Sequence, residues 1–147
     1  MRRAAIFSLT LFFATLWLSP CATAQETLYK EGSVWDIVLV KTKPGMKNEY
    51  LRSLAANWRK IHEEAKTQGL ILSYKILSST AANKQDWDIM LMTEYKGMAS
   101  LDGYDQKWGA LQEKIFGSEA GVTRIYSKQG EMREVLGEKT VREILLK

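Results

Sequence analysis

The sequence predicts a single α+β domain of the split β-α-β type, with the element order β-α-β-β-α-α-β. Short segments rich in β-branched residues alternate with longer segments whose apolar residues recur at helical spacing. One strand-like segment is nearly repeated, since WDIVLVKTKPGM at 35–46 returns as WDIMLMTEYKGM at 87–98. Each copy precedes a helical segment with a tryptophan on its apolar stripe, Trp58 in one and Trp108 in the other. Two similar βαβ halves joined by a hairpin account for these observations.

The first 24 residues are predicted to be a signal peptide. Two arginines precede an apolar stretch at 5–18, and the small-x-small pattern ATA ends at residue 24, so cleavage is expected before Gln25. The apolar stretch is too short for a convincing membrane span. A lipoprotein signal built on Cys21 is the weaker alternative, because a proline precedes this cysteine where a lipobox has a small residue. The sequence therefore predicts an exported protein, periplasmic or secreted, with no membrane span in the mature chain.

The chain left after cleavage, residues 25–147, excludes several classes of function. It carries 19 basic and 17 acidic residues, because the signal peptide takes two of the 21 lysines and arginines of the full sequence. This nearly neutral balance, without a basic cluster, argues against nucleic acid as a partner. The single cysteine also leaves with the signal peptide, which excludes disulfides, thiolate catalysis and cysteine metal sites.

The folded domain is expected at 34–147, after a flexible, polar lead-in at 25–33. Its first strand, at 34–42, is rich in β-branched residues and ends at the breaker KPG. The helix that follows, at about 46–67, has one apolar stripe at steps of three and four residues, with Gly69 as its C-cap. The remaining elements are expected in this order: strands at 70–78 and 87–95 joined by a polar hairpin loop at 79–86, a helix at about 98–116, a further helix within 118–136 whose extent stays open, a turn at 137–139 and a last strand at 141–147.

The two repeated segments are predicted to form the middle of the sheet, side by side and parallel. Alternate side chains share a face, so the face with Trp35 is taken to include the odd-numbered apolar residues of both segments and to pack against the helices. The other face is apolar as well, because it carries valines of the first segment and Met90 and Met92 of the second. Two helices cover only one face of a four-stranded sheet, and monomers rarely expose such a patch. A second copy of the chain, packed sheet against sheet, is the simplest cover.

In element order and patterning, residues 34–147 resemble the dimeric α/β-barrel superfamily, in which two ferredoxin-like units pair their sheets into a barrel. The resemblance rests on no signature motif and indicates no specific family. It implies a ferredoxin-like fold and a homodimer through the sheet face. In that superfamily a pocket between sheet and helices often carries the chemistry, and some members bind haem through a histidine, a role that the resemblance gives to His62.

Asp36 and Asp88 are the first candidate catalytic residues, because they occupy matching positions in the repeat. If the two strands are in register, the carboxylates lie at the same depth and repel each other, which raises one pKa and suits a shared proton or a general base. The plainer alternative is that each carboxylate lies near a strand end and pairs with its own lysine or arginine. A metal site would need more oxygen ligands than these two, so no metal site is predicted.

His62 is the only histidine and follows Trp58 by one helical turn, so both side chains are expected on one side of the first helix. Acid–base work or ligation is one interpretation of this residue, and a structural histidine beside the apolar stripe is the other. Tyr74, on the second strand, is a further candidate next to a catalytic carboxylate. A lone histidine excludes three-histidine metal sites and the facial triad.

Aromatic residues are plentiful at the predicted core positions. Trp58, Trp87, Tyr104 and Trp108 are candidates for the walls of a ligand pocket, although the same helical spacing is typical of a packed core. The sequence contains no Walker loop, dinucleotide fingerprint, zinc motif or nucleophile elbow, so no cofactor is predicted.

Three functions are left open. The first is a small, exported dimeric barrel protein that binds a small apolar or aromatic ligand. The second is a cofactor-free monooxygenase or isomerase-like enzyme, with Asp36 or Asp88 as the base and His62 or Tyr74 nearby. The third is a purely structural or interaction homodimer. A cavity between the sheet and the helices is expected for the first two functions and not for the third.

Overall fold

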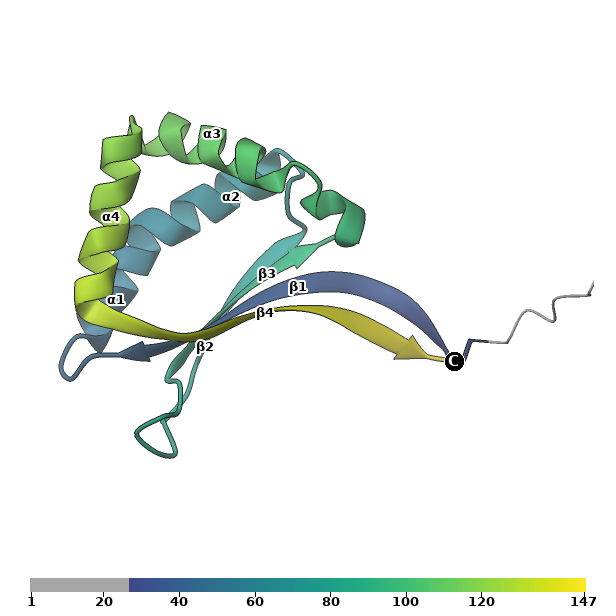
Figure 1. The fold of residues 1–147 in the computed structure, drawn as a ribbon, viewed down its shortest axis with the longest axis horizontal. Helices are drawn as coiled ribbons and strands as arrows, with labels where there is room; N and C mark the ends of the chain where they lie inside the picture. The colour runs from purple at the N-terminus through teal and green to yellow at the C-terminus, as the bar shows by residue number, and fades with distance from the viewer. Residues whose placement is uncertain (1–26) are drawn as a thin grey trace, which may run out of the picture.

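The computed structural model describes residues 27–147, so the signal peptide predicted at 1–24 lies outside the described residues. The described chain forms a four-stranded sheet with helices packed on one of its faces (Figure 1). The predicted order of strands and helices is confirmed. In chain order the elements are β1 (Tyr29–Thr42), α1 (Lys47–Ser53), the π-helical segment η1 (Leu54–Trp58), α2 (Arg59–Thr67), β2 (Ser73–Ser78), β3 (Ile89–Tyr95), the 3₁₀ segment η2 (Met98–Leu101), α3 (Tyr104–Phe116), α4 (Glu119–Met132) and β4 (Arg133–Leu146).

The strand order is β2-β3-β1-β4, and every neighbouring pair is antiparallel. The prediction that the two repeated segments run parallel is therefore wrong. The crossover through α1 and α2 makes β1 parallel to β2, but the hairpin then reverses the chain, and β3 enters the sheet between them in the opposite direction. As a result, Asp36 faces Thr93 in β3, while Asp88 lies at the other end of β1, where its N–H donates to the carbonyl of Val40 over 3.0 Å.

The antiparallel register also changes which apolar residues share a face. Residues directly opposite in adjacent strands point to the same side, so Val40 shares a face with Ile89, and both are fully buried beneath the helices. Trp35 points to the other side, so the prediction that its face packs against the helices is wrong. That uncovered side is apolar and partly exposed, and we call it the open face: Trp35, Ile37, Leu39, Met90 and Met92.

The first predicted helix is continuous but contains a π-helical turn. In η1 the N–H of Arg59 donates to the carbonyl of Leu54, five residues earlier instead of four. Leu54 and Trp58, four residues apart, both lie on the side of the helix that faces the sheet. Beyond α2, Gly69 has a φ of 70°, the left-handed conformation that glycine supplies at helix ends, as predicted.

The two longest strands begin earlier than predicted. β1 begins at Tyr29, inside the segment expected as a flexible lead-in at 25–33, because this part of the chain pairs with the end of β4. Figure 1 shows β1 and β4 continuing together beyond β3, and we call residues 28–32 and 143–146 the two-stranded arm.

β4 begins at Arg133, directly after α4, so the turn predicted at 137–139 lies inside the strand. At that point Leu39 is opposite Gly137 while Val40 is opposite Val135, which leaves one extra residue in β4. The glycine therefore marks a β-bulge and not a turn.

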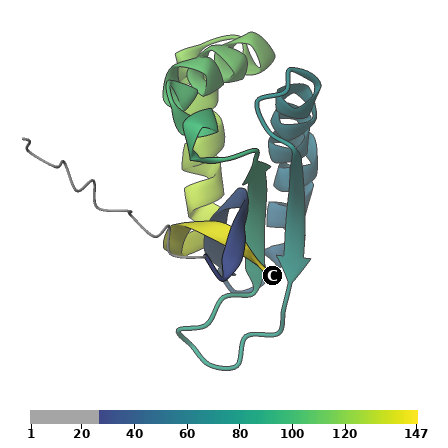
Figure 2. The same ribbon diagram turned by 90° about the vertical axis from the view of Figure 1, so that its right-hand side faces the viewer.

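Figure 2 shows the loop between β2 and β3 extending away from the helices, at the opposite end from α3. None of the helices within residues 27–147 has the length and apolar character needed to cross a bilayer. Buried side chains join the sheet to the helices in two clusters, one that includes Val34 and Leu111 and one that includes Val40 and Met132.

Candidate ligand pocket

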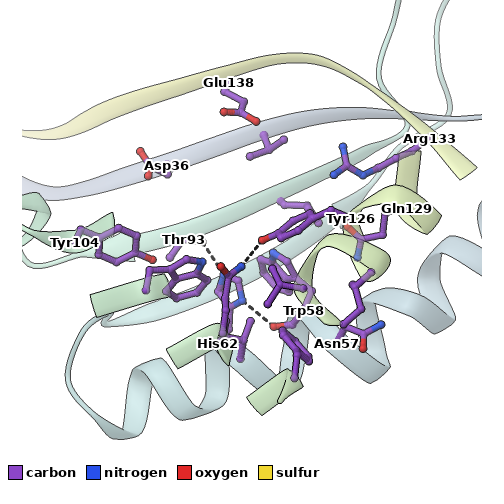
Figure 3. Close-up of a pocket in the computed structure, with 18 of the residues that line it drawn as sticks. Asp36, Asn57, Trp58, His62, Thr93, Tyr104, Tyr126, Gln129, Arg133 and Glu138 are labelled. Carbon is purple, nitrogen blue, oxygen red and sulfur yellow. Dashed lines mark hydrogen bonds between the residues drawn. The ribbon is translucent and has the colours of Figure 1, made fainter. Parts of the chain in front are cut away.

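A cavity of about 260 Å³ lies between the helix-covered face of the sheet and the helices (Figure 3). β1, β3 and β4 supply one side of it, and η1, α2, α3 and α4 supply the other. The apolar and aromatic lining residues are Val38, Trp58, Ile61, Leu91, Tyr95, Tyr104, Trp108, Phe116, Val122, Ile125 and Tyr126; the polar ones are Asp36, Asn57, His62, Thr93, Gln112, Gln129, Arg133 and Glu138. A mostly apolar lining with a few placed polar groups is typical of sites for small molecules.

His62 lines the pocket in a fixed tautomer. Its Nδ1 is 2.7 Å from the carbonyl oxygen of Trp58, and because a carbonyl only accepts, Nδ1 carries the proton. Nε2 is then the acceptor, and the hydroxyl of Thr93 donates to it over 3.1 Å. Burial lowers the pKa of His62 to about 4, although the hydrogen bond to Trp58 opposes the shift. The imidazole is therefore neutral at neutral pH.

Three of the candidate aromatic residues line the pocket together. Trp58 stacks on His62 with the ring centroids 3.7 Å apart, and Trp108 meets the same imidazole edge-on at 5.1 Å. Tyr104 stacks on Trp108 at 5.3 Å. These rings form an aromatic wall that suits the face or edge of a ligand ring. Trp87, the fourth candidate, lies before β3 and outside the lining.

Only one of the two candidate aspartates lies at the pocket. Asp36 lines it and accepts a hydrogen bond from the hydroxyl of Thr140 over 2.6 Å. Asp88 lies outside, where it accepts hydrogen bonds from the N–H of Thr42 over 2.9 Å and from the hydroxyl of the same residue, with Nζ of Lys47 4.0 Å away. The expected carboxylate pair is wrong, because it required parallel strands in register. The plainer alternative holds only in part: the two aspartates have separate partners and a lysine lies near Asp88, but Asp36 is bonded to a threonine hydroxyl and not to a lysine or arginine.

Two tyrosines lie near Asp36. The rings of Tyr95 and Tyr104 meet edge-on at 5.1 Å. Burial raises the pKa of Tyr95 to about 12, with further influence from Tyr104 and Asp36, and burial also raises the pKa of Tyr104. Both hydroxyls therefore keep their protons and can donate. Tyr74, in contrast, lies outside the lining and donates to Oε1 of Glu63 over 2.5 Å.

Gln129, Arg133 and Glu138 line the pocket although no sequence pattern singled them out for it. Arg133 is the first residue of β4, and its guanidinium lies over the ring of Tyr50, 5.7 Å from the ring centroid. All three residues reach the pocket because α4 runs directly into β4, a junction that the sequence leaves open within 118–136. The available signal was the spacing of four between Gln129 and Arg133, which is one helical turn.

Haem, which the superfamily resemblance associates with a histidine, does not fit this site. Both ring nitrogens of His62 are engaged in hydrogen bonds, and the residue is only 3% exposed beneath the ring of Trp58. Within residues 27–147, no group of three or more His, Cys, Asp or Glu side chains is placed to hold a metal ion. The lining residues offer hydrogen-bonding groups, aromatic rings and charged side chains to a ligand.

Comparisons with known proteins place the fold and no more. No protein-family model matches the chain, and no curated protein matches it. A dimeric ferredoxin-like protein from an uncultured marine organism superposes with a TM-score of 0.50 at 15% identity, over 80% of this chain and 90% of that one. A dimeric protein of unknown function with a ferredoxin-like fold, from Bacteroides fragilis, superposes with a TM-score of 0.42 at 15% identity, over 78% of this chain and 97% of that one. The predicted ferredoxin-like fold, without a specific family, is confirmed.

Proposed function

We propose that this ferredoxin-like chain is an exported homodimer that binds a small apolar or aromatic molecule in the pocket of each subunit. The observation that carries the proposal is the pocket itself, a cavity of about 260 Å³ with Trp58, Tyr104 and Trp108 in its lining. A fully packed core at these positions would leave no such space, because protein interiors contain few voids larger than a water molecule. The volume lies just below the usual range for ligand pockets and suits a molecule of one or two rings.

The mass of the protein as isolated is the first test. Native mass spectrometry is expected to show one extra small molecule per subunit, lost on denaturation. Val122→Trp, which fills the pocket from α4, should remove this mass, whereas Lys128→Trp, at an exposed position of the same helix, should keep it. Extra mass that persists in Val122→Trp would locate the ligand elsewhere. A protein that carries no ligand and takes up no added aromatic compound would leave only the structural homodimer.

The homodimer is proposed from the open face. Its side chains form an apolar surface on the two central strands, of a kind that monomers rarely expose. The two-stranded arm also exposes large apolar side chains, since Tyr29 is 43% exposed and Ile144 is 57% exposed. The marine protein of the same fold is described as dimeric, which supports the same assembly here. A second copy would cover the surface with an identical one.

Export is proposed from the signal pattern of residues 1–24. After expression of the full chain in a bacterial host, N-terminal sequencing of the periplasmic protein is expected to begin at Gln25. A full-length chain that stays in the cytoplasm would contradict this part of the proposal.

A second candidate function is cofactor-free acid–base catalysis on the bound molecule. Asp36 and His62 line the same pocket, whereas Asp88 lies outside and has no part in it. Nε2 of His62 already accepts the hydroxyl of Thr93, so Asp36 is the residue that would serve as the base. Asp36→Asn should abolish turnover of the ligand and leave its binding in place. Equal losses of binding and turnover would assign Asp36 to binding alone.

A further inference from the structure

Arg133 is the one permanently charged cation in the pocket lining, and the described residues give it no anionic partner. The ion pairs within residues 27–147 join Lys47 to Asp88, Lys114 to Glu64 and Arg142 to Glu31, and none includes Arg133. Its Nε is buried and makes no hydrogen bond of good geometry in the same part of the chain, although the Tyr50 hydroxyl lies close enough for Arg133 to lower the Tyr50 pKa against the effect of burial. A buried charged donor without a good hydrogen bond is costly, so an acceptor supplied by a ligand would relieve a real penalty.

The guanidinium is also held in place. Tyr50, which is fully buried, lies under it with the ring centroid 5.7 Å from Cζ, an arrangement that attracts a cation to the ring face. The backbone of Arg133 is fixed by pairing with Thr42 in β1. Figure 3 shows the side chain of Arg133 on the same side of the pocket as Tyr126 and Gln129, two other lining residues. A fixed, planar cation facing an apolar cavity is a preorganised site for an anion.

We infer that the pocket selects small aromatic monocarboxylates, with the carboxylate paired to Arg133 and the ring placed against Trp58 and Trp108. The inference rests on the proposed ligand-binding function and names the class of its ligand. A carboxylate matches the donor fork of a guanidinium in a bidentate pair, and the flat rings of the aromatic wall suit a flat ligand body. The side-chain amide of Gln129, buried and one helical turn before Arg133, lies beside the same position.

The opposite end of the pocket argues against a second negative charge on the ligand. Figure 3 shows Asp36 and Tyr104 on the far side of the pocket from Arg133. Asp36 is opposite Thr140 in β4, and Thr140 follows Arg133 by seven residues. The backbones of Asp36 and Arg133 are therefore roughly 20 Å apart along the strand direction. A dicarboxylate that reached Asp36 would meet its charge, whereas a ligand hydroxyl would find an acceptor there. Aromatic acids with one carboxylate, with or without a hydroxyl at the far end, meet both conditions.

Benzoate and benzamide are the probes that isolate the charge, because they have nearly the same shape. Each is titrated into the purified protein, and binding is followed by tryptophan fluorescence and checked by calorimetry. Benzoate is expected to bind at least about 10-fold more tightly than benzamide, which corresponds to about 1.4 kcal/mol. Arg133→Gln should remove this preference and leave benzamide binding unchanged. Arg124→Gln, at an exposed position on α4, is the matched control and should keep the preference.

Each other result counts against the inference in a distinguishable way. Equal affinity for the two probes in the parent protein would overturn the carboxylate inference and leave the aromatic pocket standing. A benzoate preference that survives in Arg133→Gln would assign the anion to another cation. No binding of either probe would overturn the proposed ligand-binding function as well. Should Arg133→Gln fail to fold, Arg133→Lys serves instead, since it keeps the charge but loses the planar fork and should reduce the preference.

Discussion

At the scale of single residues, the burial of His62 links the stability of the fold to pH. The folded state holds its pKa at about 4, while the unfolded chain has the ordinary value of 6.5, so the unfolded state binds the proton more readily between these values. Stability is therefore complete above about pH 6.5 and falls as the pH drops toward 4, by about 3 kcal/mol in all. The pKa shift comes chiefly from desolvation, so its size reflects how completely water is excluded from the imidazole of His62.

The prediction is that His62→Gln, which does not titrate, flattens this part of the pH dependence. Urea unfolding of the parent protein and the variant at pH 7.0, 5.5 and 4.5 measures this pH dependence of stability. The carboxylates titrate in both proteins, so their contribution cancels in the comparison. The difference in stability between them should shrink toward acid pH, by about 1 to 3 kcal/mol between pH 7.0 and 4.5. Parallel pH profiles would show that His62 is not held neutral by burial.

Asp88 carries a second prediction at this scale. Two acids crowding each other would make Asp88→Asn neutral or stabilising, but this carboxylate is bonded to the N–H and the hydroxyl of Thr42 and lies 4.0 Å from Lys47. Asp88→Asn should therefore destabilise the fold by about 1 to 2 kcal/mol, because these bonds lose their charge. Thermal or urea unfolding measures the change. Asp105→Asn, an exposed position on α3, is the control and should cost only a few tenths of a kcal/mol.

At the scale of elements, the correct predictions rest on local sequence patterns. The wrong predictions depend on the direction in which a strand runs in the sheet. The apolar stripe containing Tyr50, Leu54 and Ile61 predicts its helix correctly, because helical periodicity is visible within one segment. The repeat predicts two equivalent strands, and the expectation that these run parallel misplaces Trp35 and pairs Asp36 with Asp88. Direction is a property of the whole sheet, and no single segment encodes it.

The same distinction applies to the candidate pocket. The sequence predicts Trp58, Tyr104 and Trp108 as lining residues because large aromatic residues at helical spacing tend to face the interior. The sequence does not predict Arg133 as a lining residue, because its position depends on where α4 ends and how β4 pairs with β1. That pairing begins in a polar stretch around residue 134 that shows no strand-like alternation.

The π-helical segment η1 supports a prediction about a whole element. The hydrogen bonds of η1 span one residue more than those of an α-helix. Deleting Ala56, an exposed residue of η1, should therefore restore α-helical bonding. The apolar faces of α1 and α2 should stay aligned. The deletion should cost about 1 kcal/mol or less. Deleting Lys107 from the regular helix α3 should cost more than about 3 kcal/mol, because Leu111 would rotate out of the core. Urea unfolding compares the two, and similar costs would contradict the interpretation of η1 as one extra residue in an otherwise regular helix.

At the scale of the whole molecule, the open face is expected to separate the stability of the subunit from assembly of the proposed dimer. Its residues are only partly buried within one subunit, whereas the opposite face holds the fully buried Val34, Val40 and Ile89. Folding therefore depends on the helix-covered face, and association is expected to depend on the open one. A charge placed on the open face should interfere with pairing of the sheets and leave the subunit folded.

Ile37→Glu tests this separation. Ile37 lies at the centre of the open face, between Met92 of β3 and Lys139 of β4, so a new carboxylate has a cation beside it in the free subunit. In a two-fold dimer the charge enters the interface twice, and the dissociation constant should rise at least about 100-fold. Sedimentation velocity measures the mass, and urea unfolding measures the stability of the subunit. Ile76→Glu, at a 37% exposed position of β2 on the other side of the sheet, is the matched control and should remain dimeric.

The outcomes of this pair of variants assign the two faces. A folded monomer from Ile37→Glu beside a dimer from Ile76→Glu would locate the interface on the open face. Loss of folding in Ile37→Glu would mean that the Trp35 face contributes to the core of the subunit, as the parallel arrangement of the repeat had implied. A parent protein that is monomeric at every concentration would refute the homodimer. The partly exposed side chains of Trp35, Ile37 and Leu39 would then face water on a lone subunit, although monomers rarely expose an apolar surface of this kind.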